Sequence, residues 1–470
     1  MVFSSTFFLF AFLPLFLIVY RFTPWKAKNI VLLAASLLFY AWGAPKFIFI
    51  LLGFLCINFF IVRGLHVQNR HRKLLLALSI AINLGLLVYF KYANFFVDNL
   101  NFLLQSFGIK PLGWAKIALP VGISFITFQS LSYTVDVYRG VRAPLRLITD
   151  YLLYILMFPQ LVAGPIIRFN TIADDIADRR HNDTPDNRLY GIYRFVIGLS
   201  KKVLIANILG EQVDYLYALP HGEVTGIVAG TAALAYSFQI YFDFSGYSDM
   251  AIGLGYLMGF KFPENFNNPY TSKSVSEFWR RWHITLGAWL KDYLYIPLGG
   301  NRVSPFRTYL NLGIVFLVCG IWHGAGWNFV VWGIWHGFFI ICDKLFLNRL
   351  LTKAPSVLRV LLTFAVVTVG WVFFRLDSLG DALFFILKLF CFHGTMLHLP
   401  AEFFLAMVIA LLCSFLTATR PGQRLEKVCY AEQRPAWQHV ITFVCALLLL
   451  TACTASLSAS GFNPFIYFKF

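Results

Sequence analysis

The amino-acid sequence predicts an all-α, polytopic integral membrane protein, with roughly 11–13 transmembrane or re-entrant helices around an internal cavity. Hydrophobic residue types make up 59% of the 470 residues and charged types only 13%, against about 25% charged in a typical soluble domain. The charges gather between long apolar runs, as they do when lipid is the main solvent. Several runs are too short for a full span, which is tolerated only beside protein or a water-filled cavity.

The apolar runs follow one another along the whole chain and leave no room for a large soluble domain, so we expect a single integral membrane domain over residues 1–470. The first run is expected to be a retained helix and not a cleaved signal peptide. The sixth run is interrupted by Pro159 and Pro165. The expected helical runs are Phe3–Tyr20, Asn29–Trp42, Phe47–Val62, Leu74–Phe90, Ile117–Tyr133, Tyr151–Ile167, Gly191–Leu209, Val224–Phe244, Tyr309–Ile321, Trp327–Leu347, Leu358–Phe374, Phe403–Ala418 and Val440–Ala455.

The net charge of +17 has two interpretations, nucleic-acid binding and retention of basic loops on the cytoplasmic side of a membrane. No basic stripe with interleaved aromatic residues lies on a separable domain, which favours the second and argues against a nucleic-acid partner. The basic loops Arg21–Lys28, Arg63–Lys73 and Arg420–Arg434 are therefore expected in the cytoplasm, with the N-terminus and Phe470 outside.

Several kinds of chemistry lack their sequence motifs. The chain contains no Walker A motif, no GxSxG elbow and no histidine or carboxylate cluster with metal-ligand spacing. We therefore expect no ATP hydrolysis, no covalent serine catalysis and no catalytic metal. The scattered cysteines form no CxxC pair and predict no disulfide. Gly255 and Gly259 are interpreted as a close helix-packing pair. The polar stretch Arg168–Arg188 is interpreted as a solvated loop.

The segment Asn265–His336 is unusual because it places several ionisable groups beside apolar runs, where they are expensive and usually functional. His323 ends the run NLGIVFLVCGIW and precedes Gly324 and Gly326. A lone histidine on an apolar face is more often a core residue, but burial also keeps imidazole neutral, as a general base requires. The glycines would let backbone or a thin substrate chain approach closely. We expect His323 to be a catalytic base.

His283 lies in FWRRWHITL, beside Arg280 and Arg281 and close to Trp279 and Trp282. One interpretation is an interfacial aromatic belt with arginines that reach toward lipid headgroups. The other is a basic, aromatic-lined entry for an anionic, nucleotide-like donor, because the guanidinium group binds phosphate oxygens bidentately. Composition alone leaves both interpretations open.

The remaining candidate residues flank these histidines. His336, in WGIWHG, is not on one helical face with His323 and is interpreted either as a substrate contact or as a packing histidine. Asn268 in NFNNPY and Trp322 beside the histidine of IWHG complete the expected substrate-binding set.

Long motifs identify a family resemblance. IWHG, FWRRWHITL, DYLYIPLGGNR and YFDFSGYSDMAIGLG are similar to motifs of membrane-bound O-acyltransferases, and most resemble the bacterial alginate O-acetyltransferase branch. FKYANFF, LPVGISFITFQSLSY and FPQLVAGPI match as well. The resemblance covers most of the chain, with a signature region over residues 119–337, and weakens in the more variable C-terminal helices at residues 358–470.

The resemblance implies a ring of helices around a central tunnel through a bacterial inner (cytoplasmic) membrane. His323 matches the family's invariant histidine and His283 a second recurrent one. Acetyl-CoA is the implied donor on the cytosolic side, as a substrate and not a permanently bound cofactor. The acetyl group would reach an extracytoplasmic polysaccharide, an alginate or cellulose-type exopolysaccharide, directly or through a periplasmic acetyltransferase partner.

Other functions stay open at this point. Relatives in the resembled family modify peptidoglycan or pass D-alanine to teichoic acids, and a lipid-modifying acyltransferase would need a lateral opening to the bilayer. A different class is a transporter or flippase whose histidines relay protons. That class predicts internal repeats and paired intramembrane carboxylates, which the sequence does not clearly contain.

Overall fold

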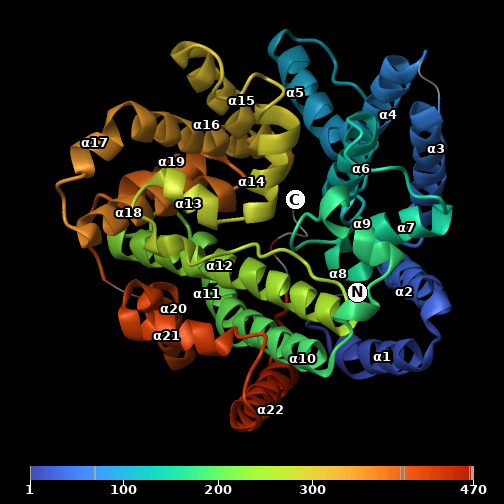
Figure 1. The fold of residues 1–470 in the computed structure, drawn as a ribbon. Coiled ribbons are helices and arrows are strands. Elements are labelled where there is room, and N and C mark those ends of the chain that lie inside the picture. The colour runs from blue at the N-terminus through green and yellow to red at the C-terminus, as the bar shows by residue number, and fades with distance from the viewer. Residues whose placement is uncertain (1, 68–69, 392, 396, 465, 467–470) are drawn as a thin grey trace. The chain divides into compact units, whose positions relative to one another are not determined.

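The computed structural model describes residues 2–67, 70–391, 393–395, 397–464 and 466, so Phe470 lies outside the described residues. Within these ranges every regular element is a helix, which confirms the predicted all-α class (Figure 1). The chain forms two compact units. The N-terminal unit is the chain up to Arg180 without Ser4–Thr6, and the C-terminal unit is Ser4–Thr6 with His181 onward.

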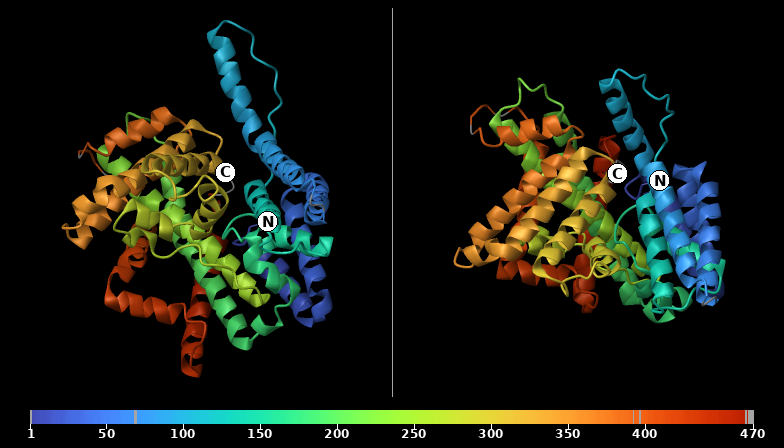
Figure 2. Two further views of the ribbon diagram at one scale, coloured as in Figure 1. Left: turned by 45° about the horizontal axis from the view of Figure 1, so that its top comes forward. Right: turned by 90° about the horizontal axis from the view of Figure 1, so that it is seen from above.

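In the N-terminal unit most predicted runs form helices, but two have different bounds. The run Leu74–Phe90 continues as helix to residue 106, and the run Ile117–Tyr133 is helical only from Ile123. Helices α4 and α5 are joined by a π-helical turn and form one continuous helix over residues 72–106. Residues 107–122 return beside it, where the side chain of Asn94 accepts from the indole N–H of Trp114 at 2.9 Å (Figure 2). The helices are α1 (Leu13–Phe22), α2 (Lys28–Gly43), α3 (Phe47–Val67), α4 (Arg72–Leu87), α5 (Ala93–Ser106), α6 (Ile123–Tyr138), α7 (Ile148–Leu156), α8 (Phe158–Leu161) and α9 (Phe169–Ala177).

Both units contain helices that are long enough to span a membrane. Among the described residues, 7 helical segments are long and apolar enough to cross a bilayer, and Phe8–Phe22 is a shorter apolar helix. The predicted multi-pass membrane protein is thereby confirmed. Three of the other predicted runs, Asn29–Trp42, Ile117–Tyr133 and Tyr151–Ile167, form shorter helices, as expected for segments surrounded by protein. The predicted run Val224–Phe244 instead lies almost entirely in a 32-residue helix, Gly226–Leu257. The central tunnel stays a prediction.

The sixth predicted run is interrupted as expected. Helix α7 ends at Leu156, the short helix α8 carries Pro159, and residues 162–168 are not helical. The segment is buried within the unit, and the carbonyl oxygen of Tyr154 accepts from the Gln160 side chain at 2.5 Å. Burial in protein with internal hydrogen bonds is what allows irregular backbone in a membrane protein.

The interpretation of Arg168–Arg188 as a solvated loop is wrong. Phe169–Ala177 forms the amphipathic helix α9, which buries Phe169 and Ile172. The guanidinium of Arg179 is also buried, where it donates to the hydroxyl of Tyr20 at 2.8 Å. The apolar residues of this stretch are few but recur at helical spacing, and the many charges around them concealed that pattern.

The C-terminal unit holds all the candidate site residues. Helices α15 and α16 form a hairpin, and α18 packs against α16 and α12 (Figure 1). The helices are α10 (Pro185–Ser200), α11 (Ile208–Tyr217), α12 (Gly226–Leu257), α13 (Val275–Arg281), α14 (Ile284–Leu290), α15 (Pro305–His323), α16 (Trp327–Cys342), α17 (Asn348–Leu351), α18 (Ser356–Arg375), α19 (Leu379–Lys388), α20 (Ala401–Phe415), α21 (Arg420–Cys429) and α22 (Ala436–Ala459).

Helices α10 and α12 approach closely through pairs of glycines. A Cβ on Gly198 would lie 2.5 Å from the carbonyl oxygen of Gly246, and one on Gly253 would lie 2.6 Å from that of Gly191. Each pair is seven residues from the next, so the glycines line one face of each helix. Backbone contact along this face fixes α12, which carries part of the candidate site.

The predicted packing role of Gly255 and Gly259 between helices is wrong. A Cβ on Gly255 would lie 2.9 Å from the ring of Phe262, just beyond the end of the same helix. Gly259 follows that end with a φ of 85°, a conformation that glycine adopts without steric cost. These glycines therefore shape the chain reversal after α12.

Candidate active site

His283 lies in the junction between α13 and α14, outside the candidate membrane spans. Its backbone is left-handed, with φ 44° and ψ 53°, which costs roughly 1–2 kcal/mol for a residue other than glycine. The strain is held by the neighbouring segment, because the Ile284 N–H donates to the carbonyl oxygen of Asn265 at 3.0 Å. Strained backbone of this kind clusters at functional sites.

The imidazole of His283 is 1% exposed, and its Nδ1 lies 3.1 Å from the Oδ1 of the fully buried Asn265. Desolvation lowers the pKa of His283 to about 3, so the ring is neutral at physiological pH. The edge of the ring meets Phe244 of α12 at a centroid distance of 4.7 Å. A buried, neutral imidazole was expected for His323, and His283 provides one as well.

His323 is the last residue of α15 and is 2% exposed. Its ring centroid lies 4.8 Å from that of Trp322, 5.0 Å from that of Trp332 and 5.2 Å from that of Phe374. These aromatic walls come from α15, α16 and α18. They place the imidazole in a dry environment, in which proton transfer and charge stabilisation are stronger than in water.

Of the two roles expected for the glycine beside this histidine, close approach of another part of the chain and passage of a substrate chain, the structure favours the first. A Cβ on Gly324 would lie 2.1 Å from the ring of Phe329. The space that the glycine leaves is filled by that phenylalanine and does not admit a substrate chain. Gly324 therefore lets α16 begin directly against the end of α15.

His336 lies one turn after Trp332 on α16, and its ring centroid is 5.0 Å from that of Trp332 and 5.2 Å from that of Trp279. It is fully buried. A Cβ on Gly370 of α18 would meet its Nε2 at 2.6 Å. His336 is thus packed tightly between helices, which favours the packing interpretation over a direct substrate contact.

The three histidines belong to one set of packed rings, here called the histidine–aromatic cluster. Trp322 bridges His283 and His323, at centroid distances of 6.2 and 4.8 Å, and Trp332 bridges His323 and His336. The α15–α16 hairpin brings together side chains that are not on one helical face. The cluster consists of His283, His323, His336, Trp279, Trp322 and Trp332.

Of the two tryptophans of FWRRWHITL, Trp282 is buried and Trp279 is half-buried. Trp282 is 1% exposed and its ring centroid lies 4.8 Å from that of Trp371 on α18. Trp279 packs against Phe316 at 5.2 Å and against Trp332 at 5.5 Å. A side chain so buried cannot contact lipid headgroups, so the interpretation as an interfacial aromatic belt is wrong for Trp282.

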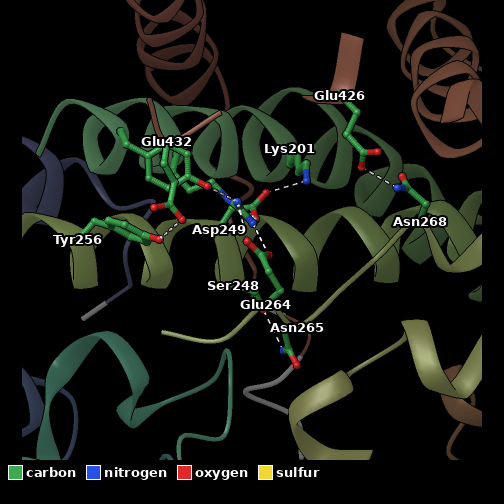
Figure 3. Close-up of polar contacts among 11 residues, drawn as sticks. Lys201, Ser248, Asp249, Tyr256, Glu264, Asn265, Asn268, Glu426 and Glu432 are labelled. Atoms are coloured by element: carbon green, nitrogen blue, oxygen red, sulfur yellow. Dashed lines mark hydrogen bonds and ion pairs between the residues drawn. The ribbon is translucent and has the colours of Figure 1, made fainter. Parts of the chain in front are cut away.

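The polar candidates have other contacts. Arg281 pairs with Glu277 at 2.7 Å and also donates to Thr271 Oγ1 at 3.1 Å, whereas Arg280 is exposed. Asn268 donates to Glu426 of α21 at 2.6 Å, at a different place from Asn265 (Figure 3). In the described part of the chain, the polar contacts of these three side chains lie outside the histidine–aromatic cluster. Arg280 is the candidate whose charge is available at the surface.

Sequence reasoning missed Asn265, Trp332, Trp371 and Phe374. Asn265 lies in the same NFNNPY motif as Asn268, and the composition of the motif does not tell which asparagine faces the histidine. The tryptophans and the phenylalanine lie in ordinary apolar helices, where an aromatic residue is usually core. The left-handed backbone at His283 and its contact with Asn265 become visible only in the folded chain.

Comparisons with known proteins identify the family of this chain. A model of MBOAT, the membrane-bound O-acyltransferase family, matches residues 147–379. The probable alginate O-acetylase AlgI of Azotobacter vinelandii is 41% identical over 505 residues, which cover 100% of both chains. That of Pseudomonas aeruginosa is 44% identical over 81% of this chain and 73% of its own. The peptidoglycan O-acetyltransferase of Helicobacter pylori is 37% identical over 82% of this chain and 78% of its own. This chain therefore belongs to the membrane-bound O-acyltransferase family and is an O-acyltransferase.

Proposed function

We propose that the protein takes an acetyl group from cytosolic acetyl-CoA and passes it across the bacterial inner membrane for O-acetylation of an extracytoplasmic polysaccharide of the alginate type. The full-length identity to probable alginate O-acetylases carries the choice of acceptor. The whole chain would act as one integral membrane domain. The acetyl group would reach the polymer directly or through a periplasmic acetyltransferase partner.

The histidine–aromatic cluster supports the chemistry. A hydroxyl group is a poor nucleophile until a base draws off its proton. His323 is the proposed base: it accepts the hydroxyl proton while the oxygen attacks the thioester carbonyl. The carbon–sulfur bond then breaks, and the imidazolium returns the proton to the departing thiolate. The products are an acetyl ester and coenzyme A thiol, and the histidine is regenerated.

The rings around His323 supply the second requirement. Trp322, Trp332 and Phe374 enclose the imidazole, and their packing excludes water that would otherwise hydrolyse the thioester. His283 is the proposed second catalytic histidine. Its ring centroid lies 6.2 Å from that of the same Trp322. Trp279, Trp282 and His336 would line or support the acyl path.

The donor is proposed to dock through basic side chains. Arg280 is exposed and able to bind phosphate oxygens bidentately. Arg281 is already neutralised by Glu277, so its contribution to donor binding is expected to be smaller. Asn268, held by Glu426, would contribute to the shape of the donor entry more than to its charge.

The test is acetyl transfer by the purified protein in detergent, without a membrane gradient. Radiolabelled acetyl-CoA and alginate oligosaccharides are supplied, with the periplasmic partner added in a parallel reaction. The proposal predicts release of coenzyme A and labelled oligosaccharide in at least one of these reactions. An intact thioester in both, together with gradient-dependent movement of polymer or lipid in sealed vesicles, would refute it.

A second acceptor has a specific observation in its favour, the 37% identity to the peptidoglycan O-acetyltransferase of Helicobacter pylori. The same assay with muropeptides as acceptor decides between the two polymers. Alginate-type transfer predicts label on the uronic-acid oligosaccharide and none on the muropeptides. The reverse distribution would assign the protein to the cell wall.

A further inference from the structure

We propose that Asn265 is a positioning residue that holds His283 in one neutral tautomer, with the hydrogen on Nδ1 and the lone pair on Nε2. His283 would thereby face the substrate only as a hydrogen-bond acceptor. The inference deepens the proposed function and rests on it where a role in acetyl transfer is concerned. The tautomer itself rests on the hydrogen bonds around Asn265.

The atom of Asn265 that faces His283 is an oxygen. The backbone N–H of Thr285 points to this atom at 3.3 Å, and the Thr285 hydroxyl lies 2.8 Å from it. A backbone N–H is only ever a donor, so the atom that receives it must be an acceptor. Because the amide oxygen of asparagine carries no hydrogen, the Nδ1 of His283 at 3.1 Å must donate to it.

The orientation of the asparagine side chain is fixed from the opposite end. Its Nδ2 donates to the hydroxyl oxygen of Ser248 on α12 at 3.1 Å (Figure 3). The preceding residue, Glu264, forms a bidentate pair with Arg194 of α10, at 2.9 and 2.6 Å. Rotation of the amide by 180° would place its NH2 group against the backbone N–H of Thr285, which can only donate. The helix packing therefore allows a single orientation.

The tautomer determines what the other ring nitrogen, Nε2, is able to do. The Nε2 of His283 is buried and has no hydrogen-bond partner among the described residues. With the hydrogen on Nδ1, this nitrogen is able to accept a hydrogen bond from a hydroxyl group. It is unable to donate one to the carbonyl oxygen of a thioester. The structure thus assigns His283 to the hydroxyl acceptor and not to the acyl oxygen.

Charged side chains on the elements around His283 are held in ion pairs. On α13, which ends two residues before it, Arg281 pairs with Glu277 at 2.7 Å. On α12, Asp243 pairs with Lys202 at 2.5 Å, and Asp249 pairs with Arg194 at 2.7 Å and with Lys201 at 2.6 Å. From α15 and α14 the neighbours of His283 are Trp322 and Thr285, which carry no charge. The amide of Asn265 is thus the contact that sets the tautomer.

The direct test is nitrogen NMR of the full-length protein labelled with ¹⁵N-histidine, with His283→Gln used to assign the signal. The proposal predicts a protonated Nδ1 and a bare Nε2 at pH 7. In Asn265→Leu this signal moves toward the Nε2–H form. A wild-type signal with the hydrogen on Nε2 overturns the proposal. This measurement needs no acetyl transfer, so its result stands whether or not the proposed function does.

The kinetic test uses three variants. Asn265→Leu is expected to lower kcat by about 10²-fold, within the range of a positioned general base, while KM for acetyl-CoA changes little. Asn265→Asp keeps the acceptor, so it retains more activity than Asn265→Leu, and its negative charge shifts the acidic limb of the pH–rate profile to higher pH. The matched control is Asn267→Ala, which alters an exposed side chain two residues away and leaves its backbone hydrogen bond to Arg281 intact.

The outcomes separate the two proposals. Unchanged kcat in Asn265→Leu, or an unshifted pH profile in Asn265→Asp, contradicts the positioning role. If His283→Gln itself transfers acetyl normally while the NMR signal shows the predicted tautomer, then Asn265 holds the ring but His283 has no part in the reaction. In that case the assignment of His283 in the proposed function fails.

Discussion

Replacement of Gly253 by alanine tests the close packing that fixes α12 beneath the site. A Cβ at this position would lie 2.6 Å from the carbonyl oxygen of Gly191 and 2.7 Å from the backbone nitrogen of Phe195. Real Cβ atoms essentially never approach closer than 3.0 Å, so α10 and α12 must separate by about 0.4 Å. Both obstructing atoms are backbone and cannot rotate away.

The cost follows from this overlap. Overpacking typically destabilises by about 1–3 kcal/mol, offset by up to about 1 kcal/mol of helix propensity gained by alanine. Gly253→Ala is therefore expected to lower the free energy of unfolding by about 1–2 kcal/mol. The matched control is Gly230→Ala in the same helix, where no atom lies within 4 Å and a gain of about 0.5–1 kcal/mol is expected.

Equilibrium unfolding of both variants in detergent micelles, followed by tryptophan fluorescence, measures the difference. Acetyl transfer should fall in Gly253→Ala as well, because α12 carries the phenylalanine and serine that contact His283 and Asn265. Equal stability of the two variants, or a more stable Gly253→Ala, would show that the backbone contact does not constrain the helices.

Three further predictions address topology, donor binding and pH. After the 8 natural cysteines, which include the exposed Cys429, are replaced, a single cysteine in the segment Arg420–Arg434 is expected to resist an impermeant thiol reagent on intact cells, and labelling from outside would reverse the orientation. Arg280→Ala should weaken acetyl-CoA binding more than Arg281→Ala, because Glu277 already neutralises Arg281; equal loss argues against a role for the exposed charge. The low pKa of His283 means that between about pH 6.5 and pH 3 the unfolded chain binds a proton that the folded chain does not. Wild-type stability should therefore fall relative to His283→Gln by about 1.4 kcal/mol per pH unit as the pH drops through that window, and parallel stability curves would contradict the burial.

The fold was predictable from the sequence because lipid offers no hydrogen-bond partners to the backbone. Long apolar runs must become helices when no water is present to satisfy the backbone, and proline at residues 159 and 165 had to interrupt one of them. Hydrophobicity along the chain does not predict the structure of Arg168–Arg188, where many charges concealed an amphipathic helix. Burial of Arg179 against Tyr20 depends on a contact across 159 residues, which no local pattern contains.

The candidate site was predictable in its residue types but not in its geometry. The histidines were identified because ionisable groups beside membrane helices are rare, and the structure gathers all three around Trp322 and Trp332. Asn268 was predicted as a substrate contact, and the contact between Asn265 and His283 was not predicted, because it depends on the left-handed backbone at His283. Local sequence does not determine this contact, which depends on the packing of α12 against the segment before α13.

Acetyl transfer by His323→Ala is the measurement that tests most directly whether the histidine–aromatic cluster is the catalytic site. The purified variant is compared with wild type and with His221→Ala, which changes an exposed histidine that contacts Asp381 outside the cluster. A positioned base contributes about 10²–10⁴-fold in rate, so His323→Ala should lose that factor while it still inserts, folds and binds acetyl-CoA, and His221→Ala should retain wild-type turnover. Near-normal turnover in His323→Ala would place the base elsewhere, with His283 the next residue to replace.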